Sequence, residues 1–305
     1  MANNMLKFLS PARNGATEPY SYRSRAKLIH TGQVIEDLND VTIDDIVVLG
    51  RIHDAQHIHT LIKKRVPFIH DICDNKYIPW DDEGAYAKLM GQWRRTNEAA
   101  IAITTTCDEL KEFIQTKTNK DVFVIPDPTE REEEQVKFLH NEKIEMVYYG
   151  SWGNYEQVDF EKYKFENTNL TIITNKSKKY PFPSHLLEWG YEIQAEIVRR
   201  SDIVLLPVNN DFEMSKYKGN NRPVDALRQG RFVITNATTP SWLKLKDFIW
   251  CGDIEEGFKW AINNVDKVKL KVYEGQKYVN KNYSIDVISN KWKEVYNVCN
   301  SRYIR

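Results

Sequence analysis

Short apolar runs alternate with amphipathic helical stretches along the whole chain, and this alternation limits the fold more than any other feature. A strand, a helix and a second strand in succession form the unit of a parallel sheet with helices on both faces. The pattern pauses at an acidic stretch and begins again at Lys143–Tyr149. We therefore predict an α/β fold with two parallel-sheet domains, joined near Glu130–Glu142.

Each expected element follows from its length and from the spacing of its apolar residues. In the first half, the expected strands are Met5–Leu9, Asp45–Leu49, Pro67–Asp71, Ala100–Thr104 and Asp121–Ile125, and the expected helices are Ser21–Gly32, His53–Lys64, Glu83–Glu98 and Asp108–Thr116. In the second half, the expected strands are Lys143–Tyr149, Leu170–Thr174, Ile203–Pro207, Phe232–Thr235 and Phe248–Cys251, and the expected helices are Tyr155–Lys164, Gln194–Arg200, Arg222–Gln229, Ile254–Val265 and Ile285–Asn300. We expect an N-terminal domain over 1–140, a C-terminal domain over 141–285 and a last helix over 286–305 that packs back on the N-terminal domain.

Composition narrows the class of protein. The 305 residues suit two domains of about 150 residues each. The formal net charge is zero, which argues against a protein that binds nucleic acid by charge alone. No apolar run approaches a length of about 18 residues, which a membrane-spanning helix needs, and the N-terminus lacks the features of a signal peptide. The four cysteines lie far apart without a CxxC pair, so we expect a cytoplasmic protein with reduced thiols.

The most informative segment is Lys218–Gly230, KGNNRPVDALRQG, which follows a buried strand that ends at Pro207. In open parallel sheets, ligands bind beyond the carboxyl ends of the strands, where loops lead into helix N-termini. Pro223 suits the first turn of a helix, which Asn220 or Asn221 can cap. The glycine that closes the segment can end the helix. We therefore predict a short helix whose N-terminus faces a ligand.

Two cations and one acid give this helix its chemistry. Lys218 and Arg222 lie beside the positive end of the helix dipole, and this combination suits a diphosphate. Asp225 follows Arg222 by three residues on nearly the same face, where a carboxylate can accept hydrogen bonds from both hydroxyls of a ribose. The alternative is a surface helix with ordinary charges, in which Asp225 only offsets the charge of Arg222.

The string DIVLLPV…KYKGNNRPVDALRQGRFVIT resembles the C-terminal signature of GT-B glycosyltransferases of the large retaining family (glycosyltransferase family 4-like), which includes relatives of sucrose and glycogen synthases. The resemblance covers roughly residues 66 to 240. It implies a GT-B fold, in which two Rossmann-like parallel-sheet domains face each other across a cleft. The positions that match the signature are Asp202, Pro207, Lys218, Asn221, Arg222, Asp225 and Gly230.

The resemblance also implies roles for these residues. Lys218, Asn221 and Arg222 would bind the donor diphosphate, and Asp225 would hold the ribose. Met146–Ser151 resembles the first strand and glycine turn of the donor domain, so Gly150 and Ser151 are expected to approach the diphosphate. The chain departs from the pattern upstream, because Tyr217 stands where the family has a glutamate close to the donor sugar; Glu213 and Asp211 in the preceding loop are substitutes for it.

The acceptor side is assigned to the first half of the chain. His70 and Asp71 end a predicted strand, and their side chains suit contact with an acceptor hydroxyl or a donor sugar. The alternative is that Asp71 and Asp74 cap the next helix. Our candidate catalytic residues are His70, Asp71, Lys218 and Arg222, with Arg13 as a further ligand of the donor diphosphate and with Asp74, Arg23 and Arg25 as acceptor ligands.

Neither a metal ion nor a cofactor is expected. His53 and His57 share a helical face, but no further ligands stand at metal-binding spacing. The sequence also lacks a DxD motif between strands, which metal-dependent glycosyltransferases use. The nucleotide-sugar is then the donor substrate, and no other small molecule is needed.

The sequence therefore predicts a glycosyltransferase that moves a sugar from a nucleoside-diphosphate sugar to an acceptor hydroxyl. Two acceptors stay open, a saccharide or glycan and double-stranded DNA with hydroxymethylated bases, as in phage enzymes that act in the host cytoplasm. The compact length and the basic N-terminal segment fit DNA without deciding between the two acceptors. Trp93 with Arg94-Arg95 could line a cleft for DNA, but a core tryptophan on an amphipathic helix is the favoured interpretation of Trp93. A third hypothesis is a non-catalytic nucleotide-sugar-binding protein with a degenerate GT-B fold, because the upstream glutamate is missing.

Overall fold

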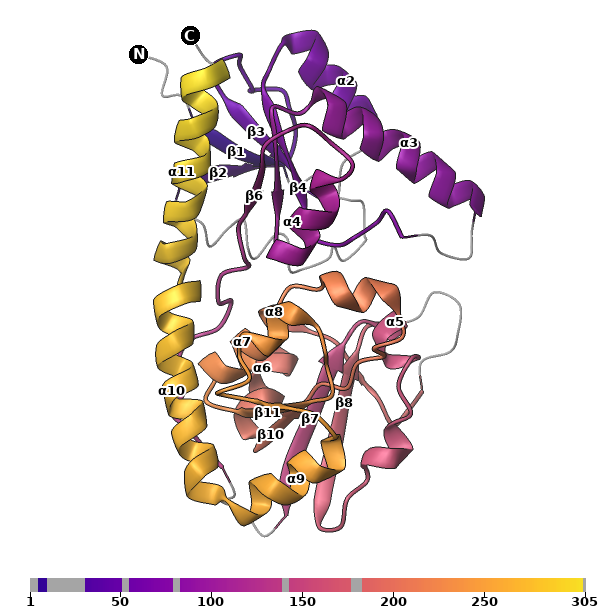
Figure 1. Ribbon diagram of the computed structural model, residues 1–305, viewed down its shortest axis with the longest axis vertical. Helices are drawn as coiled ribbons and strands as arrows, with labels where there is room; N and C mark the ends of the chain where they lie inside the picture. Colours follow the sequence, from indigo (N-terminus) through magenta and orange to yellow (C-terminus); the bar gives the residue numbers. More distant parts are fainter. Residues whose placement is uncertain are drawn as a thin grey trace. The chain divides into compact units, whose positions relative to one another are not determined.

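The computed structural model describes residues 5–9, 31–50, 55–78, 83–138, 143–176 and 183–303. The chain divides into two compact units (Figure 1). The first unit comprises Met1–Glu130, Tyr217–Gly219 and Tyr283–Arg305, and the second comprises Arg131–Lys216 and Asn220–Asn282. Each unit is built on one six-stranded sheet.

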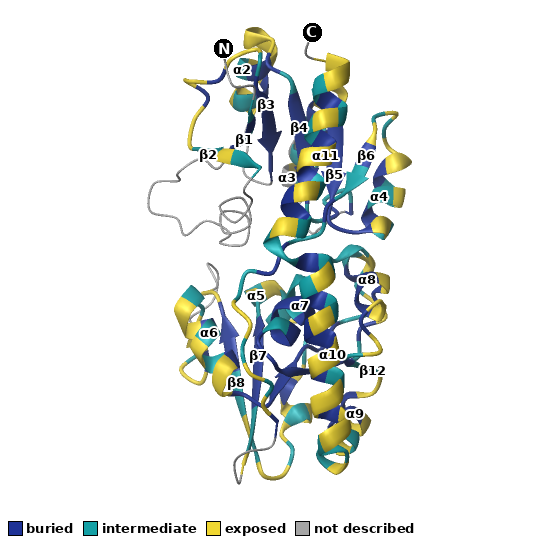
Figure 2. Cartoon of the chain, turned by 90° about the vertical axis from the view of Figure 1, so that its left-hand side faces the viewer, coloured by how far each residue is buried: buried dark blue, intermediate teal, exposed yellow. Residues whose placement is uncertain are grey.

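The sheet of the first unit is parallel throughout, with the strand order β2-β1-β3-β4-β5-β6. Strands β3, β4 and β5 are buried along their whole length, which a parallel sheet requires when helices cover both faces (Figure 2). The strands are β1 (Leu6–Leu9), β2 (Gly32–Ile35), β3 (Ile46–Leu49), β4 (Phe68–Ile72), β5 (Ala102–Thr105) and β6 (Val122–Val124), and the helices are α2 (Ala55–Lys64), α3 (Glu83–Ala99), α4 (Asp108–Gln115) and α11 (Ile285–Tyr303).

Helix α11, the last helix of the chain, completes the core of the first unit. Its buried residues Ile288, Trp292 and Val295 belong to the same apolar cluster as Leu6 and Phe8 of β1. The rings of Phe8 and Trp292 meet edge to face with their centroids 5.0 Å apart. Residues from the two ends of the sequence therefore share one core.

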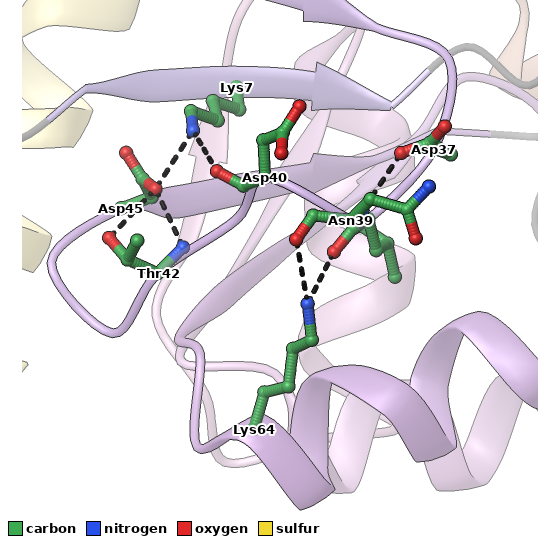
Figure 3. Close-up of polar contacts among 8 residues, drawn as sticks. Lys7, Asp37, Asn39, Asp40, Thr42, Asp45 and Lys64 are labelled. Atoms are coloured by element: carbon green, nitrogen blue, oxygen red, sulfur yellow. Dashed lines mark hydrogen bonds and ion pairs between the residues drawn. The ribbon is translucent and has the colours of Figure 1, made fainter.

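The segment between β2 and β3 is fastened by charged side chains (Figure 3). Lys7 of β1 forms a salt bridge of 2.9 Å with Asp45, and the Asp45 carboxylate also accepts hydrogen bonds from the backbone N–H and the hydroxyl of Thr42. The Lys64 ammonium donates to the carbonyl oxygens of Leu38 and Asn39. These bonds hold the chain where it enters β3.

The sheet of the second unit is also parallel throughout and has the order β12-β11-β10-β7-β8-β9. Counted from β7 as the first strand, this is the order 3-2-1-4-5-6 of dinucleotide-binding sheets. The strands are β7 (Ile144–Gly150), β8 (Thr168–Thr174), β9 (Leu187–Glu188), β10 (Ile203–Leu205), β11 (Phe232–Thr235) and β12 (Trp250–Cys251); the helices are α5 (Trp152–Tyr155), η1 (Phe160–Tyr163), α6 (Tyr191–Arg200), η2 (Glu213–Tyr217), α7 (Asn221–Arg228), α8 (Pro240–Leu243), α9 (Ile254–Asn263) and α10 (Val265–Tyr283).

The structure confirms the ten predicted strands and corrects three other expectations. Gly32 lies in β2 rather than at the end of a helix. The helix expected over Tyr155–Lys164 is instead the short α5 and a 3-10 turn, separated by Asp159, whose carboxylate accepts from the N–H of Glu161. Helix α10, which was not predicted from the sequence, spans nineteen residues. No helix among the described residues is long and apolar enough to cross a membrane.

Candidate functional site

The strand order of the second unit marks one place for a ligand. The chain leaves β7 toward β8 on one side and returns to β10 on the other, so β7 and β10 flank the topological switch point. Ligands of such sheets bind beyond the carboxyl ends of these two strands. The turn at Gly150 follows β7, and the loop from Leu206 to Asn220 carries the chain from β10 into α7. The predicted donor residues Gly150, Ser151, Asn221 and Arg222 all lie at this edge.

The Arg222 side chain is held in place by the end of β7. Its Nη1 donates to the carbonyl oxygen of Tyr149 at 3.3 Å, and the Tyr149 hydroxyl donates back to the carbonyl oxygen of Arg222 at 2.9 Å. The guanidinium carbon lies 5.3 Å from the ring centroid of Trp242, which is 1% exposed. A cation over an aromatic face is stabilised by the ring quadrupole. Arg222 is thus an oriented, half-buried cation at the switch point.

The glycine of the β7 turn is required by its own neighbours. A Cβ on Gly150 would lie 2.5 Å from the Tyr148 hydroxyl oxygen and 3.2 Å from Nη1 of Arg222. Tyr148 is fully buried, and its hydroxyl makes no hydrogen bond of good geometry with the described residues. Burial raises the pKa of the Tyr148 phenol, and the nearby Arg222 opposes this only in part. A neutral phenol and a guanidinium therefore meet beside the Gly150 backbone.

The N-terminus of α7 offers few backbone donors. Asn220 occupies the cap position without capping, because its amide donates to the carbonyl oxygen of Ser241 at 3.3 Å. The Asn221 side chain accepts from the N–H of Arg222 at 2.9 Å, and Pro223 has no N–H. The sequence expectation that an asparagine caps this helix is therefore wrong for Asn220. The charge of the site comes from the Arg222 guanidinium and the helix dipole.

Asn236, which follows β11, fixes the loop that leads into α7. Its side chain accepts from the N–H of Val208 at 2.7 Å and donates to the Val208 carbonyl oxygen at 3.0 Å. The Asn210 amide donates to the Asn236 carbonyl oxygen, and the Thr239 hydroxyl donates to that of Ser215 at 2.8 Å. Two loops at the same sheet edge are joined in this way, so the start of α7 has a defined position.

The two acids of the signature differ in setting. Asp225 lies one turn beyond Arg222 on α7 and is 7% exposed. Asp202 is fully buried at the start of β10, where its carboxylate accepts from the N–H of Glu145 at 3.0 Å. Asp202 therefore joins β10 to β7 at the amino edge of the sheet, away from the switch point. Ser151 is exposed and makes no side-chain cap to α5.

Lys218 belongs to a different unit from Arg222. It lies in Tyr217–Gly219, which groups with the first unit. There the Tyr217 ring packs against Phe113 with centroids 5.1 Å apart, and the Tyr217 carbonyl oxygen accepts from the Cys107 thiol. Tyr217 thus has the contacts of a packing residue. Glu213 and Asp211, the expected substitutes for the missing glutamate, are both exposed.

His70 and Asp71 lie within the first unit on β4, facing opposite sides of the sheet. His70 is fully buried; its Nδ1 is 2.6 Å from the amide oxygen of Asn97, and its ring meets Trp93 edge to face. Asp71 is 3% exposed and accepts from the Thr104 hydroxyl at 2.7 Å. The structure therefore gives both predicted catalytic side chains the contacts of core residues.

The remaining predicted positions divide into two groups. Asp74 is half-buried in the loop after β4, with the Lys76 ammonium 3.8 Å away. Arg13, Arg23 and Arg25 lie outside the described residues. Within the described ranges, no three His, Cys, Asp or Glu side chains are grouped as a metal site would require.

Three residues of the site were not found from the sequence. Tyr148 looked like an ordinary strand residue, Asn236 an ordinary turn residue, and Trp242 lies in a stretch with no predicted element. Their common signal is position: Tyr148 lies near the carboxyl end of β7, and Asn236 and Trp242 follow the carboxyl end of β11, which pairs with β10. Residues at such ends face the ligand edge regardless of their type.

No protein-family model and no curated protein sequence matches the chain. Solved structures do match. TarM from S. aureus, in complex with Fondaparinux, alpha-GlcNAc-glycerol and UDP, superposes with a TM-score of 0.60 at 13% identity, covering 84% of this chain and 56% of TarM. A trehalose-6-phosphate synthase studied for enzymatic glycosyltransfer with retention superposes with a TM-score of 0.57 at 11% identity, covering 85% and 74% of the two chains. A structure from E. coli bound with UDP-2-fluoro glucose superposes with a TM-score of 0.55 at 11% identity. The match covers 84% of this chain and 73% of the other.

The chain thus spans a little over half the length of TarM. At such low identities the likeness concerns the fold. Two observations agree on the fold. The chain has two parallel sheets, each with helices on both faces, and it superposes on these structures over more than four-fifths of its length. This protein has the GT-B fold, with two Rossmann-like units.

Proposed function

We propose that this protein is a glycosyltransferase that uses a nucleoside-diphosphate sugar as its donor. The observation that carries the proposal is the Arg222 guanidinium, which Tyr149 and Trp242 orient at the switch point of the second unit. A planar cation beside a helix N-terminus suits a diphosphate. The matched solved structures support this donor class, because two of them contain UDP or a UDP-sugar.

In the proposed reaction, the bond from the anomeric carbon to the diphosphate oxygen breaks, and a bond to the acceptor oxygen forms. The nucleoside diphosphate leaves with an added negative charge, and the proton of the acceptor hydroxyl passes to the leaving diphosphate or to water. Arg222 and the dipole of α7 stabilise the charge on the leaving diphosphate, which lowers the barrier most where the site is already organised. Asp225 binds the ribose, and Gly150 and Ser151 border the diphosphate.

We assign no proton transfer to His70 or Asp71, because both are buried and hydrogen-bonded inside the first unit. Retention of configuration is proposed from the fold likeness to an enzyme studied for glycosyltransfer with retention. We also propose that the charge balance needs no metal ion. Turnover should then persist in EDTA, and loss of turnover in EDTA with recovery on adding Mg²⁺ or Mn²⁺ would contradict this part.

We propose a saccharide as the acceptor. TarM was crystallised with saccharide compounds, and the synthase acts in the formation of trehalose 6-phosphate, so both matched proteins handle sugars. Hydroxymethylated DNA is the second candidate, and its sequence support lies in the basic segment with Arg23 and Arg25. Trp93, the candidate for a DNA cleft, is 6% exposed and packs on His70 and Tyr77, which are the contacts of a core tryptophan.

The test is mass spectrometry of products after incubation with mixed nucleotide-sugars and both acceptor types. The proposal predicts a saccharide product heavier by one glycosyl residue, together with free nucleoside diphosphate. If the product is glycosylated hydroxymethylated DNA, the protein is still a glycosyltransferase, but its acceptor is DNA and the proposed saccharide acceptor is wrong. Neither product, with no slow hydrolysis of any donor in the absence of acceptor, would favour the non-catalytic binding protein instead.

A further inference from the structure

A cavity lies in the first unit, on the layer formed by α3 and α4. It has a volume of about 510 Å³, within the range of about 300–1,000 Å³ typical of small-molecule sites. We call it the α3–α4 groove. The residues that line it are Tyr77, Tyr86, Met90, Arg94, Asn97, Glu98, Phe113, Lys117, Thr118 and Asn119.

One side of the α3–α4 groove is aromatic. Tyr77, Tyr86 and Phe113 are each half-buried, so part of every ring is exposed. Tyr77 is fixed between neighbours: its ring meets Trp93 edge to face with centroids 5.6 Å apart, and the Tyr86 hydroxyl donates to its carbonyl oxygen at 2.6 Å. Rings held in this way present apolar surface without losing further side-chain entropy when a ligand binds.

A buried amide directs the Tyr77 hydroxyl. Asn97 is 3% exposed, its oxygen faces Nδ1 of His70 at 2.6 Å, and its Nδ2 donates to the Tyr77 hydroxyl oxygen at 2.6 Å. The Tyr77 oxygen is thus an acceptor toward Asn97, and its own proton is directed to another partner. Burial raises the Tyr77 pKa, more than the Asn97 hydrogen bond lowers it, so the phenol keeps that proton. His70, assigned to catalysis from the sequence, here serves to position a donor.

The lining of the groove also carries charge. Arg94 and Lys117 are exposed, and the Lys117 ammonium lies 5.3 Å from the centroid of the Phe113 ring. Among the described side chains, neither cation forms a salt bridge. Glu98 is the one acidic residue of the lining, against these two cations. An anion-binding end therefore adjoins an aromatic wall.

We propose that the α3–α4 groove binds a saccharide that carries one anionic group, such as a phosphate. The aromatic rings contact the apolar face of the sugar, Tyr77 donates to a sugar oxygen, and Arg94 and Lys117 pair with the anion. The groove runs from Tyr77, beyond the carboxyl end of β4, to Thr118 and Asn119, which precede β6. It therefore extends away from the edge where reactions occur in such sheets and holds a saccharide without transforming it.

A nucleic acid fits the surroundings less well. The stretch from residue 93 to residue 122 contains five basic residues (94, 95, 111, 117 and 120) and five acidic residues (98, 108, 109, 112 and 121). A polyphosphate chain needs a net positive surface along its length. A single anionic group needs only the local pair of cations.

The test is direct binding to the full chain, measured by calorimetry or by ligand-observed NMR, with no donor present. The probes are glucose 6-phosphate, glucose, inorganic phosphate and a short oligothymidylate. We expect glucose 6-phosphate to bind more tightly than glucose or phosphate alone. Arg94→Gln and Lys117→Gln should each weaken its binding by about three- to tenfold, because each removes one charge contact. Tyr77→Phe removes the hydroxyl donor and should weaken the binding of glucose and of glucose 6-phosphate by the same factor.

Lys269→Gln is the matched control, because it removes an exposed lysine charge from α10 in the second unit. It should leave binding unchanged. The proposal is overturned if no probe binds, if phosphate binds as tightly as glucose 6-phosphate, if the oligonucleotide alone binds, or if Arg94→Gln and Lys117→Gln bind like the control. Since no donor is present, these outcomes are independent of whether the proposed glycosyl transfer occurs.

Discussion

At the scale of single residues, the candidate donor site depends on three side chains that pack at one turn. The absence of a side chain at Gly150 leaves room for the Tyr148 hydroxyl and for Arg222. Arg222 in turn is held by the Tyr149 backbone and by Trp242. The glycine was expected from the sequence because a diphosphate approaches it. The structure adds an internal reason, since the space beside the glycine is already occupied by protein atoms.

Gly150→Ala should therefore lower the free energy of unfolding by about 1–3 kcal/mol through overpacking. Tyr148→Phe removes the hydroxyl that the new Cβ would meet, so the double variant should recover part of this loss. Tyr148→Phe alone should be neutral or slightly stabilising, because the buried hydroxyl lacks a well-formed partner. Urea denaturation of the four proteins gives the coupling energy, and strict additivity would contradict the contact.

Asp45 gives a prediction about pH. Burial raises its pKa, but hydrogen bonds from Thr42 and the bond and charge of Lys7 lower it more, so the pKa of the folded state lies below the usual value. The stabilisation is then complete above the unfolded pKa of about 3.9 and is lost as the pH falls through the folded pKa. Asp45→Asn should lower the free energy of unfolding by about 1 kcal/mol at pH 7, and by progressively less as the pH falls. The measurement is the free energy of unfolding of the wild type and of Asp45→Asn as a function of pH. A difference between the two proteins that stays constant from neutral pH to about pH 2 would refute the prediction.

At the scale of elements, local patterns predicted the strands and missed what depends on packing. Strands such as β10 and β11 are short, continuous apolar runs rich in Ile and Val, and this length and composition favour a buried strand over a helix. Helix α10 was not predicted, and it contains Gly275, a residue type that disfavours helices. In the structure this glycine allows close packing, since a Cβ would meet Leu227 at 2.9 Å. The buried Gln276 also breaks the apolar stripe, and it donates to the carbonyl oxygens of Glu134 and Arg228.

Arg231 is a charged residue that sequence reasoning missed, and it fastens the end of helix α6. It is 1% exposed, and its guanidinium donates to the carbonyl oxygens of Val198, Arg199, Gln135 and Gly230. Burial lowers its pKa. Carbonyls at a helix C-terminus have no partners within the helix, so a cation there satisfies them.

Arg231→Met should lower the free energy of unfolding by about 3 kcal/mol, because several buried carbonyl oxygens lose their donor together. Arg231→Lys should lower the free energy of unfolding by less than Arg231→Met does, because lysine keeps the charge. It should still be less stable than the wild type, because lysine cannot reach as many acceptors. Thermal melting followed by circular dichroism measures both. As a reference, Arg200→Gln removes an exposed arginine of α6, for which the described residues show a salt bridge with Glu196. Equal effects of Arg231→Met and Arg200→Gln would show that burial of Arg231 is not stabilising.

At the scale of the whole molecule, the restart of the strand and helix pattern was enough to predict two parallel sheets. The order of the strands was not readable, because β9 and β12 are two residues long and β2 was hidden behind a helical pattern. The order decides where the switch point lies, and hence that Arg222 and Gly150 meet while Asp202 remains at the opposite edge. The assignment of Lys218 to the first unit follows from tertiary contacts, which no local pattern reports.

The central claim, that Arg222 binds the donor diphosphate, is tested most directly by nucleotide binding. UDP, GDP and ADP are titrated into the wild type, Arg222→Gln and the control Arg200→Gln, with circular dichroism to verify folding. The account predicts that Arg222→Gln lowers the affinity for the preferred nucleoside diphosphate at least about tenfold and abolishes turnover. The control should behave as the wild type. A folded Arg222→Gln protein with affinity and turnover within about threefold of the wild type would contradict it.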